Sequence, residues 1–340
     1  MVLFISQTRN VVNAQLIFAG GAFVYIARML TKRAFGNTGL SVSPLGFGSA
    51  PVGFLEQDNH QAGRILNFLL DHGMNVIDTG ECYAGAEDMI GSTMAHRRNE
   101  YVLITKCGHK FPGAEGAEWT PQLVRQSVEN SLRRLRTDHL DVVLLHTPAL
   151  EVLKKGDVMT VLIEARDAGK IRFLGFSGDN DDAAYAAGLP DVRVIETSVS
   201  ICDQANIDNV LPLAAKRGLG VIAKRPIANS AWLPASAHRG FYGDYSRPYA
   251  ERLRKMEILP GDIGFDGATR RELWPEIALR FTISIPEVHT AIVGTTKLDN
   301  ARANLDNIQV GPLPDLVVKK IREAFAEAEK RAGERWLGLT

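Results

Sequence analysis

Eight short apolar runs, separated by longer stretches with helical periodicity, constrain the fold of this chain more than any other sequence feature. Each run is apolar at its centre, as is typical of parallel strands buried on both faces. Alternating strands and helices leave two architectures, the closed (β/α)8 barrel and the doubly wound open sheet. Eight units within about 270 residues favour the (β/α)8 TIM barrel of the α/β class. The predicted strands are Leu45–Gly48, Asn75–Asp78, Tyr101–Lys106, Asp141–His146, Phe173–Ser177, Val194–Thr197, Gly220–Lys224 and Thr290–Val293.

The segments around these runs have recognisable ends. Thr120 followed by Pro121 predicts a helix start, because a threonine cap and a first-turn proline are typical of that position. Before the first strand, residues 32–42 carry the Asn and Gly turn chemistry of a small β-hairpin. After the last strand, residues 316–331 are amphipathic at helical spacing. We therefore expect an N-terminal hairpin and a C-terminal helix that packs outside the barrel.

The chain divides into an N-terminal extension, residues 1–30, and a single barrel domain, residues 31–340, because no linker or composition shift interrupts the latter. Residues 11–27 are mostly apolar but contain Asn13 and Gln15, and they are short for a membrane span of about 20 residues. No cleavage site of a secretory signal follows them. We expect a non-native extension or a loose helix outside the barrel, with a membrane anchor as the alternative.

Charge and cysteine content exclude several classes of protein. The chain has 39 Lys and Arg residues against 39 Asp and Glu residues, so its formal net charge is zero. Zero charge argues against non-specific binding to nucleic acid or to anionic membranes. Three cysteines without a CxxC pair exclude a disulfide scaffold and a cysteine-based zinc site, and they fit a reducing compartment. We therefore expect a cytoplasmic protein without a metal site, and the oligomeric state stays open.

Polar side chains end five of the predicted strands. Asp78, Lys106, His146 and Ser177 end the second to fifth strands, and Lys224 ends the seventh, with Arg225 next to it. In a (β/α)8 barrel the C-terminal strand ends form the active site, so these side chains should meet at one rim. Tyr83 follows the second strand closely and should lie at the same rim.

The residue types in this set suggest proton transfer to a carbonyl. A tyrosine has a pKa near 10, and the ammonium of Lys106 would stabilise its phenolate and lower that pKa. The carboxylate of Asp78 would hold Lys106 in place and keep it charged, and a neutral His146 could orient a carbonyl oxygen. Such a site would reduce a carbonyl or oxidise an alcohol, with hydride supplied by a cofactor.

Several motifs in a fixed order resemble the aldo-keto reductase family from Lys32 to about Leu316. They are residues 37–48, 73–79 with Tyr83 soon after, 104–106, 131–135 leading to Asp141 and His146, 169–177 and 292–295. The resemblance implies a (β/α)8 barrel with NADPH as hydride donor. It implies that Tyr83 is the general acid, that Lys106 and Asp78 tune it, and that His146 orients the substrate.

The resemblance also implies contacts to the nicotinamide. Ser177 matches the family serine that bonds the carboxamide, although Gly178 and Asp179 stand where many members have another polar continuation. Glu196 falls where a glutamine is usual in the same contact, and a carboxylate cannot donate to the carboxamide oxygen.

The remaining cofactor contacts that the resemblance implies lie at three strand ends. They are Gly48, Ser49, Lys224, Arg225, Pro226, Gly294, Thr295, Thr296, Lys297, Asn300 and Asn304. Lys297 with Thr296 would suit a 2′-phosphate, which favours NADPH over NADH. The glycines near Gly48 do not form a dinucleotide fingerprint, because Pro51 stands where its third glycine is needed.

A long connection, residues 226–269, predicts a binding loop, because connections of that length are rarely structural necessities. The candidate aromatic walls of a substrate pocket are Trp119, Trp232, Phe241, Tyr242 and Tyr245. Cys82 and Cys107, beside two of the site residues, are expected to be bystanders, since the sequence shows no activating base.

The favoured function is reduction of an aldehyde or ketone by NADPH. One alternative is a sugar (aldose or lactol) 1-dehydrogenase working in the oxidative direction, since residues 50–53 are similar to such members. Another is a cofactor-binding regulatory subunit with slow turnover. The substrate stays open between a small carbonyl compound and a sugar, because substrate loops vary independently of the catalytic set in this fold.

Overall fold

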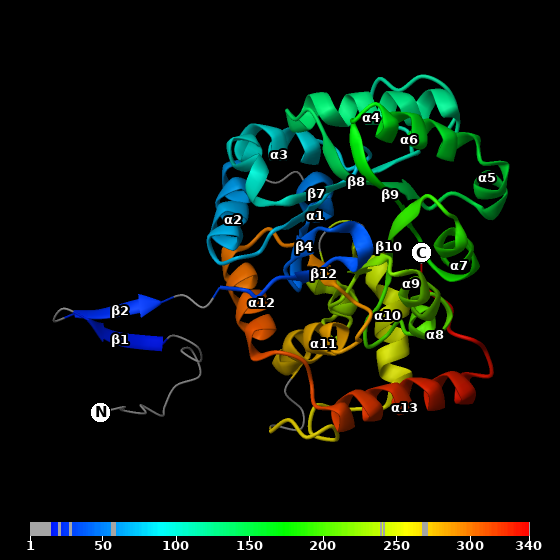
Figure 1. The fold of residues 1–340 in the computed structure, drawn as a ribbon. Coiled ribbons are helices and arrows are strands. Elements are labelled where there is room, and N and C mark those ends of the chain that lie inside the picture. Colours follow the sequence, from blue (N-terminus) through cyan, green and yellow to red (C-terminus); the bar gives the residue numbers. More distant parts are fainter. Residues whose placement is uncertain are drawn as a thin grey trace.

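The computed structural model describes residues 15–19, 22–26, 29–55, 59–238, 240, 242–266 and 271–339. Eight parallel strands close into a barrel in sequence order, with the last strand paired to the first (Figure 1). The strands are β5 (Leu45–Gly48), β6 (Val76–Asp78), β7 (Val102–Cys107), β8 (Leu140–His146), β9 (Ile171–Ser177), β10 (Val192–Ser198), β11 (Gly220–Lys224) and β12 (Thr290–Val293). The predicted barrel is confirmed, and each predicted strand is found within two residues of its expected ends.

Helices surround this barrel (Figure 1). They are α1 (Ala50–Phe54), α2 (Asn59–Asp71), α3 (Ala86–Met94), α4 (Pro121–Leu135), α5 (Leu150–Lys155), α6 (Asp157–Asp167), α7 (Asn180–Gly188), α8 (Ala205–Asn209), α9 (Leu211–Arg217), α10 (Tyr242–Met256), α11 (Trp274–Ile283), α12 (Leu298–Val310) and α13 (Asp315–Ala332). Thr120 caps α4 as expected, because its side chain accepts a hydrogen bond from the Leu123 amide.

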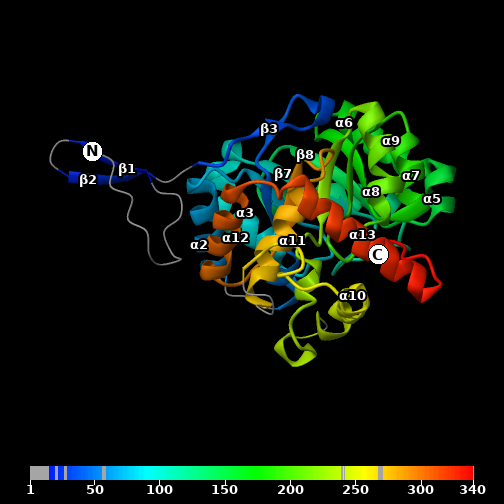
Figure 2. The ribbon, with the colours of Figure 1, turned by 90° about the horizontal axis from the view of Figure 1, so that it is seen from below.

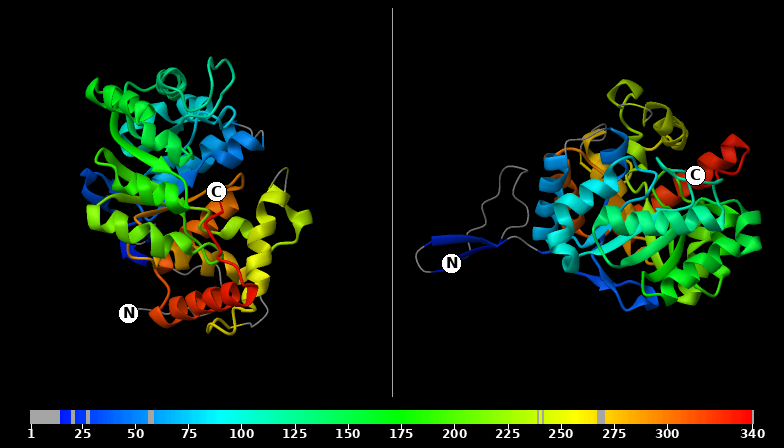
Figure 3. Two further views of the ribbon diagram at one scale, coloured as in Figure 1. Left: turned by 90° about the vertical axis from the view of Figure 1, so that its right-hand side faces the viewer. Right: turned by 90° about the horizontal axis from the view of Figure 1, so that it is seen from above.

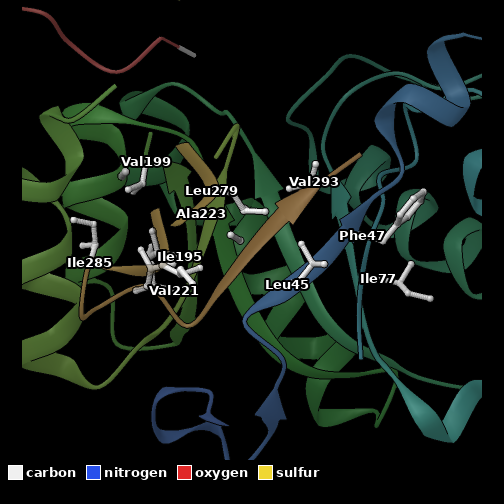
Figure 4. Close-up of a cluster of buried hydrophobic side chains, with 14 of the residues drawn as sticks. Leu45, Phe47, Ile77, Ile195, Val199, Val221, Ala223, Leu279, Ile285 and Val293 are labelled. Atoms are coloured by element: carbon white, nitrogen blue, oxygen red, sulfur yellow. The ribbon is translucent and has the colours of Figure 1, made fainter. Parts of the chain in front are cut away.

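The strands bury both of their faces, which explains their apolar sequences. Side chains such as Ile104, Leu144 and Ile222 form one buried cluster together with Phe35, which lies between the two strands of the N-terminal hairpin. Other residues of the same strands, such as Ile77 and Ile195, belong to a second cluster that includes residues of the surrounding helices (Figure 4). Each such side chain contributes about 1.5–3 kcal/mol when fully buried, so the two clusters hold the strand ends in a fixed arrangement.

The expected additions at both ends of the barrel domain are present. β3 (Arg33–Ala34) and β4 (Ser41–Val42) form the antiparallel hairpin. Helix α13 buries Ile321, Phe325 and Ala328 along one face. It lies beside α10, as two views of the molecule agree (Figures 2 and 3).

The N-terminal segment differs from the loose helix that its sequence suggests. β1 (Gln15–Ala19) and β2 (Ala22–Ile26) pair antiparallel in a separate two-stranded sheet, and neither strand belongs to the barrel. Among the described residues, no helix has the length and apolar character needed to cross a membrane.

Candidate active site

The polar strand ends converge on one cleft of about 590 Å³ at the C-terminal rim of the barrel. Asp78, Tyr83 and His146 line this cleft, from the end of β6, the β6–α3 loop and the end of β8. Lys106, near the end of β7, lies behind the wall and is only 1% exposed. The structure therefore brings together the four residues that the sequence singled out for catalysis.

Lys106 is held by a buried acidic pair. Its Nζ donates to Asp78 Oδ1 and Oδ2 at 2.6 and 2.7 Å and to the Thr79 carbonyl at 3.0 Å. Glu196 Oε2 lies 3.5 Å from the same nitrogen. Burial alone would lower the pKa of Lys106, but Asp78 and Glu196 together raise that pKa well above its usual value. Lys106 therefore remains a cation.

Tyr83 lies on the cleft wall beside this cation. Lys106 Nζ is 5.2 Å from the centre of the Tyr83 ring, and Phe54 packs against the ring at 5.3 Å. Burial raises the pKa of Tyr83 well above its usual value, and Asp78 and Glu196 raise it further, while Lys106 opposes them. The expected lowering by Lys106 is present, but burial of the phenol outweighs it, so the net shift of this pKa is upward. The phenol stays protonated at neutral pH.

His146 faces Tyr83 with ring centres 6.0 Å apart, edge to face. Its Nδ1 lies 3.6 Å from Cys82 Sγ. Burial lowers the pKa of His146 well below its usual value, and the cation of Lys106 lowers it further. His146 is therefore neutral and can donate from one ring nitrogen. Burial also raises the pKa of the Cys82 thiol to about 12, which leaves it a poor nucleophile.

Ser177 and Glu196 lie next to each other on the cleft wall. Ser177 Oγ donates to Glu196 Oε1 at 3.1 Å. The other oxygen, Oε2, is buried and has no hydrogen-bond partner among the described residues. The Glu196 carboxylate thus adds a second acceptor-only group beside Lys106, where a glutamine would add a neutral amide.

Asp179 organises the end of the seventh barrel strand. This buried carboxylate accepts hydrogen bonds from Lys224 Nζ at 2.8 Å, from the Ser198 amide at 2.7 Å and from Thr197 Oγ1 at 2.9 Å. Burial would raise the pKa of Asp179, but Lys224 and Arg225 outweigh it and hold that pKa at about 2. Lys224 lines the cleft as an ion pair with Asp179, so its charge is already largely compensated.

Of the two neighbouring cations, Lys224 and Arg225, Arg225 is the one whose charge is less compensated. Its guanidinium stacks over the Tyr245 ring at 4.9 Å and donates to Tyr249 Oη at 3.1 Å and to Ser198 Oγ at 3.3 Å. Arg225 and Pro226 both line the cleft. The guanidinium is therefore fixed in place beside the cleft by a ring and two hydroxyl groups.

Only some residues of the segment after β12 line the cleft. Gly294, Thr295, Thr296 and Asn300 line the cleft together with Gly48. A Cβ on Gly294 would lie 2.5 Å from the Gly48 carbonyl oxygen, so only glycine fits where the ends of β5 and β12 meet.

Three of the expected cofactor residues do not line the cleft. Lys297 is exposed directly before α12, and its amide donates to Thr295 Oγ1 at 3.1 Å. Asn304 is buried within α12, and Ser49 is buried directly before α1.

The long connection after β11 contributes a helix as well as loops. Residues 242–256 form α10, although the sequence suggested a loop there, and Tyr242 and Tyr245 line the cleft as expected. Trp232 is buried away from the wall, and Trp119 reaches the site through a contact to His109. Phe241 lies outside the described residues.

Sequence reasoning missed five polar residues on the wall, His109, Thr147, Asn229, Ser230 and His238. His109 and Thr147 stand within two residues of the ends of β7 and β8, so extending the search past the last strand residue would have found them. Within the part of the chain that the structure describes, no group of three or more His, Cys, Asp or Glu residues could hold a metal ion.

The cleft fits a dinucleotide. Its volume is within the usual range of cofactor sites. Glu196 Oε2 and Asn229 Nδ2 are buried polar atoms of wall residues, and neither has a hydrogen-bond partner among the described residues. Buried polar atoms normally have partners, so an acceptor and a donor remain for a ligand. Arg225 supplies a cation at the same wall.

The closed barrel, with tyrosine, lysine, aspartate and histidine together at its C-terminal rim, defines the class of barrel oxidoreductases. The chain belongs to the aldo-keto reductase family, because the Aldo/keto reductase family matches residues 44–326. This match confirms the resemblance that the sequence motifs indicate.

Two sequence relatives and one solved structure illustrate the family. L-galactose dehydrogenase of Arabidopsis thaliana is 26% identical, over 80% of this chain and 86% of its own length. D-arabinose 1-dehydrogenase of Saccharomyces cerevisiae is 30% identical, over 63% of this chain and 68% of its own length. The holo form of aldo-keto reductase AKR11C1 from Bacillus halodurans has a TM-score of 0.72 and 26% identity, covering 87% of this chain and 96% of its own.

Proposed function

We propose that this protein interconverts a carbonyl compound and an alcohol, with NADPH as the hydride donor and Tyr83 as the general acid. The observation that carries the proposal is the meeting of Tyr83, Lys106 and His146 at one cleft, with Lys106 fixed at 2.6 Å by Asp78. A protonated phenol, a fixed cation and a neutral imidazole are the groups that a carbonyl oxygen needs as it gains a proton.

Each side chain then has a defined task. Tyr83 Oη gives its proton to the carbonyl oxygen in reduction and takes the proton of the hydroxyl group in oxidation. Lys106 stabilises the phenolate that remains, and Asp78 keeps Lys106 charged and in place. His146, held neutral by burial, orients the oxygen by hydrogen bonding. Because Lys106 and Asp78 are buried, their charges are screened less by water than surface charges are.

NADPH supplies the hydride when it is bound. Ser177 and Glu196 would hold its nicotinamide end, since Glu196 Oε2, which has no hydrogen bond and only a 3.5 Å ion pair with Lys106, can accept from a carboxamide NH₂ group. Arg225, Pro226 and the Asp179-paired Lys224 would lie along the pyrophosphate. For the adenosine end we propose the wall residues Gly294, Thr295, Thr296 and Asn300, with Gly48 behind them and Lys297 reaching in from the start of α12.

Oxidation of a sugar at its anomeric carbon is the second candidate reaction. L-galactose dehydrogenase and D-arabinose 1-dehydrogenase, both relatives of this chain, are named for sugar oxidation. In that reaction the lactol carbon would give its hydride to the oxidised nicotinamide, and its hydroxyl would give its proton to Tyr83 as the phenolate, which leaves a lactone and the protonated phenol. The same four residues serve both directions, so this candidate changes the substrate and not the machinery.

A panel of substrates tests the proposed function. The purified protein is assayed with aldehydes, ketones and aldoses, in both directions, by the absorbance of the reduced nicotinamide. Turnover of at least one carbonyl or alcohol is the expected result. Tight NADPH binding without turnover on any of them would favour the regulatory-subunit alternative.

Cofactor choice is tested at Lys297. Lys297→Ala should weaken NADPH binding about tenfold, because a charge-assisted contact to the 2′-phosphate is lost. NADH lacks that phosphate, so its dissociation constant should stay within twofold. Fluorescence titration of both cofactors measures the effect, and Lys319→Ala, an exposed lysine on α13, is the matched control. Equal weakening of the two cofactors would mean that Lys297 only shapes the start of α12.

We also propose a cytoplasmic location. Its support is the cysteine content, since none of the three cysteines Cys82, Cys107 and Cys202 is placed in a disulfide, which fits a reducing compartment.

A further inference from the structure

His109 is a cleft residue outside the proposed catalytic set. It stands two positions after the end of β7 and lines the cleft. Its ring meets the His146 ring edge to face, with centres 4.8 Å apart, so it is next to the proposed carbonyl-orienting group. Any substrate whose carbonyl reaches His146 therefore brings its neighbouring atoms to His109.

The position of His109 is fixed by a carboxylate and a ring. Glu118 Oε1 lies 3.2 Å from His109 Nδ1 and also accepts from the Lys110 amide at 2.9 Å. A carboxylate only accepts hydrogen bonds, so Nδ1 carries a proton and Nε2 is an acceptor. Trp119 packs against the other side of the His109 ring, with centres 4.6 Å apart.

The loop that carries these residues is closed by a glycine. The Trp119 amide donates to the Gly108 carbonyl at 3.1 Å. Gly108 has φ of +117°, and a Cβ there would lie 1.9 Å from the Trp119 ring. A side chain at this position would push the tryptophan away, and His109 would lose its support. The chain is thus built to hold His109 in one place.

Thr147 completes the arrangement from the next strand end. It follows His146 directly and lines the cleft, and its Oγ1 donates a hydrogen bond to His109 Nε2 at 3.2 Å. Its φ is +56°, a left-handed conformation that is a genuine outlier for a β-branched residue. Its amide donates to the Ser177 carbonyl at 2.8 Å, which helps to hold the strained backbone. Strain of this kind, of order 1–3 kcal/mol, concentrates at ligand-binding sites.

We propose that Thr147 Oγ1, oriented by its hydrogen bond to His109 Nε2, accepts a hydrogen bond from a hydroxyl group of the substrate close to the reacting carbon, and that the substrate class is therefore an aldose. The proposal rests on the proposed function, since it adds a specificity site to that reaction. A hydroxyl oxygen has two lone pairs, so Thr147 Oγ1 can accept from the substrate while its own proton stays in the hydrogen bond to His109. Glu118 acts as a positioning residue, because it touches His109 and not the substrate.

Thr147→Val and His109→Phe test the pair, since both changes keep the shape of the side chain and remove its polar atoms. Two probes are compared, an aldose and 4-nitrobenzaldehyde, which has no hydroxyl group. In each variant kcat/KM for the aldose should fall about ten- to hundredfold relative to kcat/KM for the aldehyde, with most of the loss in KM. Thermal melting and NADPH titration confirm that the variants fold and bind the cofactor.

A 2-deoxy aldose and two variants of Glu118 make the test specific. Wild type should prefer the aldose to its 2-deoxy analogue, and Thr147→Val should lose most of that preference, because the hydroxyl has then lost its partner. Glu118→Ala should raise KM for the aldose, and Glu118→Gln, which keeps an acceptor oxygen, should restore part of it.

Two results would overturn the proposal while leaving the proposed function standing. One is an equal loss on both probes, which would mean that His109 and Thr147 only support His146. The other is a wild type that reduces aldehydes but does not act on any aldose. A wild type inactive on every carbonyl and alcohol would overturn the proposed function itself, and this site with it.

Discussion

Tyr83→Phe is expected to lower turnover by about 10²- to 10⁴-fold, the usual contribution of a general acid. The variant keeps the ring that packs against Phe54 at 5.3 Å and lies under Lys106, so the wall of the cleft is retained. Only the proton donor is lost. Burial raises the pKa of this phenol, so it is protonated and ready to donate at neutral pH in the wild type.

The loss should appear in kcat and kcat/KM alike, because the proton is transferred in the transition state. NADPH affinity, measured by fluorescence titration, should stay within twofold. Tyr242→Phe removes a hydroxyl from the same cleft and is the matched control, with a much smaller expected loss. Near-full activity of Tyr83→Phe on every substrate that wild type accepts would show that another group donates the proton.

The barrel and the convergence of its strand ends were predictable because they follow from short-range patterns. A strand buried on both faces must be apolar, and the first polar side chain after it marks its C-terminal end. Asp78, Lys106 and His146 all follow this pattern. Closure of the barrel brings these strand ends together for any conformation of the loops. The sequence therefore located the catalytic candidates without any knowledge of the loop conformations.

Properties that depend on loops and on enclosure were not predictable in this way. His109 and Thr147 reach the cleft only because residues 108, 119 and 147 adopt left-handed backbone conformations. The direction of the Tyr83 pKa shift depends on how far the cleft excludes water, which no local pattern encodes. Helix α10 was mistaken for loop because Pro248 within it and the glycines around it argue against a helix.

Lys106→Met is expected to abolish activity and to lower the free energy of unfolding by about 3–5 kcal/mol. Methionine fills the space of the lysine stem, but Asp78 then loses the cation that lies 2.6 Å away, and breaking one side of a buried pair costs about that much. Glu196, another buried carboxylate, adds to the cost because it faced the same nitrogen at 3.5 Å.

The variant should also gain a characteristic pH dependence. Burial and then Glu196 already raise the pKa of Asp78, and removing Lys106 raises it further. The folded variant then binds a proton that the unfolded chain releases, so its stability falls as pH rises from the ordinary carboxyl pKa, near 4, to the raised one. The slope approaches about 1.4 kcal/mol per pH unit for one such proton. Denaturant unfolding between pH 4 and pH 8 measures it.

A double variant separates the structural role of the pair from its catalytic role. Lys106→Met with Asp78→Asn removes both opposite charges, so about half or more of the lost stability should return and the pH slope should become shallower. Activity should not return, because Tyr83 has lost the cation that stabilises its phenolate. Recovery of turnover in the double variant would show that Lys106 serves only to neutralise Asp78 and takes no part in the chemistry.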